Sequence, residues 1–167
     1  MSDRASLRDP TVFSRPSELE NQATRIFRAP PERVFQLFTD PSTVAMAFTT
    51  DPSRAMIERY EFRPGGRYSI VVRGKDGSEC RFQGEFLEIV PPERVVNSFE
   101  VSVWPGVRAV ETDEFERVGE TTRLTVRWRF STRAERDRMA GVGGEGGISE
   151  QWDHLADLLE QGWPKTV

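Results

Sequence analysis

Alternating apolar and polar residues mark segment 64–96 as two long strands and the start of a third. Tyr68 and Ile70 fall on one side of the first strand, as the two-residue period of a strand requires. Residues 75–77, Lys-Asp-Gly, suit a tight hairpin turn because glycine readily adopts positive φ. Phe82 resumes the apolar face on the return strand. These features predict an antiparallel meander at the centre of the chain.

The same patterns place the other elements around this meander. Seven strands are expected, at residues 18–28, 57–63, two within 64–96, and at 94–103, 108–117 and 121–130. Two short helices should follow the first strand, one opening at Pro31 and one running from Pro41 to Phe48. A longer helix is expected at 148–161, because Trp152 and Leu155 fall on one face of it. The predicted fold class is α+β, with a seven-stranded antiparallel sheet wrapped around this C-terminal helix.

Composition fits one ordinary globular domain. The chain has 167 residues, of which 37% are apolar and 30% charged, and its net charge is −4. Residues 1–17 are polar with two prolines, so we expect a flexible extension before a single domain at 18–162. The acidic balance argues against nucleic acid or an anionic membrane as a partner. No apolar run reaches the length of a membrane span, and the N-terminus lacks an apolar signal segment, which together predict a cytoplasmic protein.

Residues with strong chemistry are scarce. One cysteine, Cys80, and one histidine, His154, exclude an internal disulfide, a cysteine cage and a multi-histidine metal site. The glycine-rich stretch 141–147 lacks the Lys-Ser/Thr of a phosphate loop, and we expect it to be a flexible joint. The sequence therefore predicts neither a metal nor a cofactor.

Several motifs resemble one known superfamily. These motifs are TRIFRAPPERVFQLFTDPS, RPGGRYSIVVRGKDG, FQGEFLEIVPPERVV, TRLTVRWRF and the helix around Trp152-Asp153-His154-Leu155. They resemble the START-like, birch-pollen-allergen-like (SRPBCC) superfamily, in the branch of proteins like the activator of the heat-shock-protein-90 ATPase (AHSA-like). The resemblance covers residues 18–160 and implies a helix-grip fold with a ligand cavity between the sheet and the last helix. Many relatives carry Trp-Trp-Gly-Pro at the cavity mouth, where this chain has Ala47-Phe48-Thr49-Thr50.

Strand parity predicts which side chains face that cavity. The expected cavity residues share the apolar side of the sheet or lie on the helices that cover it: Phe38, Phe48, Tyr68, Ile70, Phe82, Asn97, Phe99, Val101, Glu111, Trp128 and Trp152. Glu111 and Asp113 share the parity of Phe115, so two carboxyls should lie on a mostly apolar wall. Burial would raise the pKa of such a carboxyl, which makes these two the candidate catalytic residues. The alternative is that both lie at solvated strand ends, or that a bulge turns them to the other face of the sheet.

Three functions stay open at this point. The first choice is a protein that binds a small hydrophobic or aromatic molecule. The second is an enzyme like the polyketide cyclases and dehydratases, with Glu111 or Asp113 as acid and base. The third is a chaperone co-factor or another protein-interaction module, and a homodimer is a further option.

Overall fold

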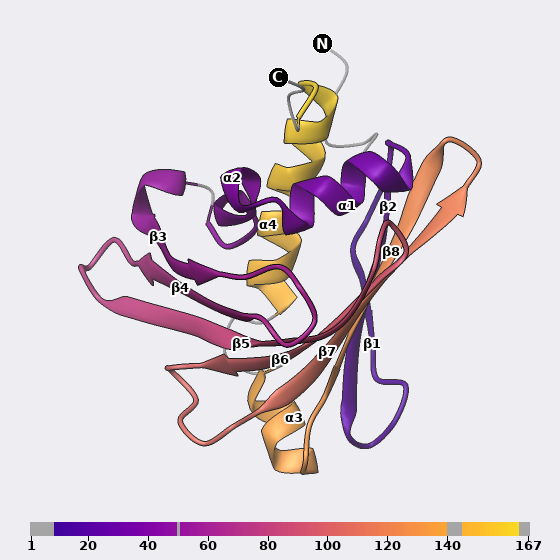
Figure 1. The fold of residues 1–167 in the computed structure, drawn as a ribbon. Coiled ribbons are helices and arrows are strands. Elements are labelled where there is room, and N and C mark those ends of the chain that lie inside the picture. The colour runs from indigo at the N-terminus through magenta and orange to yellow at the C-terminus, as the bar shows by residue number, and fades with distance from the viewer. Residues whose placement is uncertain (1–8, 50, 140–144, 164–167) are drawn as a thin grey trace.

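The computed structural model describes residues 9–49, 51–139 and 145–163. Within these residues, eight antiparallel strands form a sheet with the order β1-β2-β8-β7-β6-β5-β4-β3 (Figure 1). The strands are β1 (Val12–Ser14), β2 (Glu20–Phe27), β3 (Ala55–Tyr60), β4 (Arg67–Arg73), β5 (Glu79–Val90), β6 (Arg94–Val101), β7 (Ala109–Val118) and β8 (Thr121–Arg129). The helices are α1 (Pro31–Thr39), α2 (Pro41–Val44), η2 (Ala45–Ala47), η3 (Pro52–Arg54), α3 (Arg133–Met139) and α4 (Glu145–Glu160).

The sheet curves around α4, and α1 and η2 contact α4 (Figure 1). Trp152, Leu155 and Leu159 are buried on one side of α4, as the predicted stripe requires, together with Leu158. This arrangement confirms the α+β fold with an antiparallel sheet and a C-terminal helix. The core between sheet and helices includes fully buried Phe27.

The prediction of seven strands was wrong, because β1 adds an eighth. This strand lies in the segment expected to be a flexible extension, and Phe13 pairs there with Ala23 of β2. Phe13 also packs against the hydrophobic core. Three residues are too few to show a two-residue period, so the pattern gave no signal. Residues 1–8 of the predicted extension lie outside the described residues.

The C-terminal helix begins earlier than expected, at Glu145 instead of Ile148. Gly146 and Gly147 therefore belong to its first turn, although each glycine costs a helix about 1 kcal/mol relative to alanine. Gly147 and Ile148 both contribute to the cavity wall described below. The other residues of the predicted glycine joint, 141–144, lie outside the described residues.

Local sequence features explain where the helices near the site begin and where the chain turns between strands. Pro31 occupies the start of α1, where its missing N–H has no helical partner to lose. Asp40 caps α2, and its carboxylate accepts a hydrogen bond from the backbone N–H of Ser42 at 2.8 Å. Gly77 has φ +85° in the hairpin turn between β4 and β5, as the Asp-Gly pair predicted.

Two irregularities bend the half of the sheet formed by β3, β4 and β5. The register of β3 on β4 shifts between Ile57 and Arg59, and the register of β5 on β6 shifts between Phe86 and Glu88. Gly84 of β5 lies so close to β6 that a Cβ atom there would be 1.9 Å from the carbonyl oxygen of Ser98. Any side chain at this position would force the two strands apart. These features let the sheet curve and bring its concave face around a cavity.

Candidate functional site

A cavity of about 310 Å³ lies between the concave face of the sheet and α4. All eleven residues expected at a cavity from strand parity line it, and so does Asp113. They come from β4, β5, β6, β7, β8, α1, α4 and the residue after η2. The structure therefore gathers the predicted positions around one space, and their contact with a ligand remains a prediction.

Sequence reasoning missed several wall residues. Tyr60 pairs with Tyr68 in the register of β3 on β4, but the bulge after Ile57 breaks the parity that would have indicated it. Phe62 lies just beyond β3 and also lines the cavity. Gln151 could have been predicted from the sequence, because it is three residues from Ile148 and shares its helix face.

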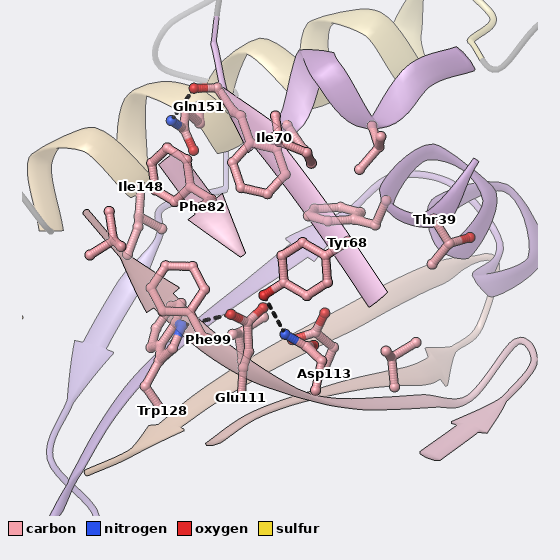
Figure 2. Close-up of a pocket in the computed structure, with 18 of the residues that line it drawn as sticks. Thr39, Tyr68, Ile70, Phe82, Phe99, Glu111, Asp113, Trp128, Ile148 and Gln151 are labelled. Atoms are coloured by element: carbon pink, nitrogen blue, oxygen red, sulfur yellow. Dashed lines mark hydrogen bonds between the residues drawn. The ribbon is translucent and has the colours of Figure 1, made fainter. Parts of the chain in front are cut away.

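The polar part of the wall crosses three neighbouring strands. Asn97 of β6 pairs with Glu111 of β7, and Glu111 pairs with Trp128 of β8. The indole Nε1 of Trp128 donates a hydrogen bond of 2.9 Å to Oε2 of Glu111 (Figure 2). The amide Nδ2 of Asn97 donates at 3.1 Å to the hydroxyl of Tyr68, which itself donates at 2.8 Å to the carbonyl of Ser98. One continuous polar patch thus interrupts an otherwise mainly apolar wall.

Asp113 lies two residues further along β7 and faces the same cavity. Its Oδ1 atom is buried and has no hydrogen-bond partner in the described part of the chain. Most buried polar atoms in proteins are hydrogen-bonded, so an unpaired carboxylate oxygen on a cavity wall marks a position where a donor is missing.

Both carboxyls have raised pKa values. Removal from bulk water raises the pKa of Glu111, and its interactions with Asp113 and Trp128 only partly oppose that shift. Burial raises the pKa of Asp113 well above its usual range, and the charge of Glu111 raises it further. Because two neighbouring carboxylates in a low-dielectric site do not both ionise easily, the pair tends to retain a proton. The raised pKa predicted for Glu111 from its strand parity agrees with this direction.

No positively charged side chain among the described wall residues compensates this pair. Among the described residues that line the cavity there is no arginine, lysine or histidine, and His154 lies elsewhere on α4. The described part of the chain also brings no three acidic, cysteine or histidine side chains together as a metal site. The pair therefore faces aromatic side chains and cavity space.

The rim of the cavity joins α4 to the segment after α2. The side-chain amide of Gln151 donates a hydrogen bond of 2.9 Å to the backbone carbonyl of Phe48 (Figure 2). The ring of Phe48 also contacts Phe82 of β5, with the ring centroids 5.0 Å apart. Ala47 and Phe48, which replace the tryptophan-rich motif of many relatives, both line the cavity.

Comparison with models of protein families identifies the family of this chain. The model of one family, described as "Activator of Hsp90 ATPase homolog 1-like protein", matches residues 28–160. The chain belongs to this family. The AHSA1-like match confirms the SRPBCC superfamily and the AHSA-like branch that the motifs suggested. A search among curated proteins found no match.

Solved structures share the AHSA1-like fold. A crystal structure of a Rhodobacter sphaeroides protein has 20% identity and a TM-score of 0.80, covering 90% of this chain and 98% of that one. Protein Ms6760 from Mycobacterium smegmatis has the same identity and TM-score, with coverage of 90% and 97%. A solution structure from Arthrobacter aurescens has 23% identity and a TM-score of 0.80, covering 90% and 91%. These similarities show the fold alone. In the described residues of the present chain, no helix has the length and apolar character needed to cross a membrane.

Proposed function

We propose that this protein binds a small, mainly apolar molecule in the cavity between the sheet and α4. The observation that carries the proposal is the cavity itself, about 310 Å³ in volume, with aromatic walls and one polar patch. Small-molecule sites in proteins are typically concave, mostly apolar and several hundred cubic ångströms in volume, with few polar groups to fix orientation. Membership of the AHSA1-like family agrees with a ligand-binding domain.

Packing physics supports a binding role for this space. Protein interiors are close-packed, and voids much larger than a water molecule are rare because the lining atoms lose contacts. An engineered cavity of roughly 150 Å³ already binds small apolar molecules such as benzene. A larger aromatic-walled cavity should gain more from the contacts that a ligand restores.

The binding function is tested with a neutral fluorescent probe, N-phenyl-naphthylamine. Its emission should rise saturably on addition of the wild-type protein. Val101→Phe fills cavity space and should weaken binding at least tenfold, because Val101 is buried on the wall. Val110→Phe is the matched control, since Val110 is exposed and is not a wall residue. Equal probe affinity in wild type and Val101→Phe, or no binding at all, would contradict the proposal.

A second candidate function rests on the pair of carboxyls. Glu111 and Asp113 have raised pKa values for the reasons given above, and a carboxyl that keeps its proton near neutrality can donate it while its neighbour accepts one. This favours an acid–base enzyme like the polyketide cyclases and dehydratases as the alternative. Glu111→Gln keeps the side-chain shape and removes the titration. Acid–base catalysis predicts that turnover of a candidate substrate is lost in this variant while its affinity is retained.

A further inference from the structure

We infer that the ligand is an amphipathic amine, whose ammonium group binds between Glu111 and Asp113 while its apolar or aromatic body lies against the aromatic wall. This inference rests on the proposed binding function and specifies the chemical class of the ligand. It follows from four properties of the polar patch: its engaged donors, its unpaired acceptor, the absence of cations among the described wall residues and the aromatic rings around it.

The hydrogen-bond donors of the patch are already engaged within the protein. The indole N–H of Trp128 is bonded to Glu111, and the hydroxyl of Tyr68 donates to the carbonyl of Ser98. The amide of Asn97 uses both of its hydrogens, on the hydroxyl of Tyr68 and on the carbonyl of Ser98, each at 3.1 Å. A ligand that needed donors from these groups would have to break existing bonds. The patch can instead offer acceptors.

One acceptor of the patch is not satisfied. Oδ1 of Asp113 is buried and has no hydrogen-bond partner among the described residues. Leaving such an atom unpaired costs free energy, and a donor from the ligand would remove that cost. An ammonium group carries three donors and no acceptor, so it can donate to Oδ1 of Asp113 and to Glu111 at once. Its positive charge would also favour loss of the proton that the pair otherwise retains.

The charges of the cavity wall also favour an ammonium group. The remaining titratable groups among the described wall residues are Tyr60, Tyr68 and Cys80, and burial raises the pKa of each, so all three are neutral near pH 7. The two carboxyls therefore set the sign of the charge inside the cavity. A ligand carboxylate would be repelled, whereas an ammonium would neutralise an acidic pair that lacks a cation.

Aromatic rings surround the place where the ammonium would lie. Tyr68 lines the cavity together with Glu111 and Asp113, and Figure 2 shows its ring beside the two carboxyls. Phe99 projects from β6 on the same face as Asn97, and Figure 2 shows its ring above Trp128 and to the left of Glu111. Cations are attracted to the faces of such rings, most strongly where water is excluded. Carboxylates and aromatic rings together therefore favour a cationic head with an apolar body.

The test uses three ligands with one common skeleton: naphthylethylamine, naphthylethanol and naphthylacetate. Their affinities for the whole protein are measured by isothermal titration calorimetry at neutral pH and low salt. The amine should bind at least tenfold more tightly than the alcohol, and the acetate should bind most weakly.

Variants assign that preference to the two carboxyls. The double variant Glu111→Gln/Asp113→Asn should lose the preference for the amine, since the amide side chains keep the shape of the patch and carry no charge. Glu114→Gln/Glu116→Gln removes the same charge from neighbouring positions of β7 that do not line the cavity, and should keep the preference. A tenfold preference that survives in the Glu111→Gln/Asp113→Asn variant would overturn the assignment.

Other outcomes separate this inference from the binding function. Amine and alcohol binding with equal affinity would overturn the inference and point to a neutral donor bound by a pair that shares a proton. Tighter binding of the acetate would also overturn it. Retention of the neutral probe in either case would leave the binding function intact. If neither the probe nor any of the three ligands binds, the binding function itself fails.

Discussion

Replacement of the carboxyls of Glu111 and Asp113 by amides should change how the stability of the protein depends on pH. In the folded protein both pKa values are raised, chiefly because burial disfavours the charged forms. In the unfolded chain the same groups titrate near pH 4. Above that pH the folded state therefore holds more protons than the unfolded chain, and the stability of the wild type must fall as the pH rises through the folded-state values. Below about pH 4 the pair is protonated in both states and this loss is absent.

The magnitude follows from counting protons. While the folded state holds one proton more than the unfolded chain, the free energy of unfolding falls by about 1.4 kcal/mol per pH unit. For a domain of this size that corresponds to roughly 3–6 °C in Tm per pH unit. The variant Glu111→Gln/Asp113→Asn cannot titrate, so its Tm should rise relative to wild type as the pH increases.

Thermal unfolding followed by circular dichroism, from about pH 5 to about pH 8, measures this difference; the starting point lies above the ordinary carboxyl pKa values. Glu116→Gln is the control, because Glu116 is an exposed residue of the same strand with a salt bridge to Arg123. The control should follow the wild type. If the gap in Tm between wild type and the double variant stays constant over this range, the two carboxyls have ordinary pKa values and the reasoning about the cavity wall is refuted.

Three further changes test individual contacts. Trp152→Ala should lower the free energy of unfolding by about 3–5 kcal/mol in denaturant titrations, since Trp152 is buried and packs on Phe27 with ring centroids 5.8 Å apart; an unchanged midpoint would show that α4 is not part of the core. Gly84→Ala should cost at least about 1–3 kcal/mol in the same assay, because the new Cβ would meet the Ser98 carbonyl, and wild-type stability would contradict that close approach. Gln151→Ala removes the hydrogen bond to Phe48 across the rim and should speed release of the neutral probe in stopped-flow measurements; an unchanged release rate would show that the rim contact does not limit exchange.

The sequence indicated the cavity wall best where the strands pair regularly. β6, β7 and β8 are paired without a register shift, so parity along them correctly placed Asn97, Glu111 and Trp128 on one face. Parity failed at β3, where the bulge after Ile57 hides the inward position of Tyr60. A two-residue period carries no information across a bulge, because the extra residue reverses the faces.

Other features depend on tertiary packing and could not be derived from local patterns. The three residues of β1 form a strand by pairing with the edge of β2. So short a strand has no detectable two-residue period. The helix α4 extends back over two glycines that local propensity disfavours. The unpaired Oδ1 of Asp113 likewise depends on which donors the neighbouring strands bring near it.

The binding of a small molecule in the cavity is tested most directly by the four tryptophan indole N–H signals in nuclear magnetic resonance. Trp104, Trp128 and Trp152 line the cavity, whereas Trp163 is a described residue outside its wall and serves as an internal reference. Titration with N-phenyl-naphthylamine should shift the three cavity signals saturably and leave the Trp163 signal in place. A titration that moves only Trp163, or none of the four signals, would contradict a ligand site between the sheet and α4.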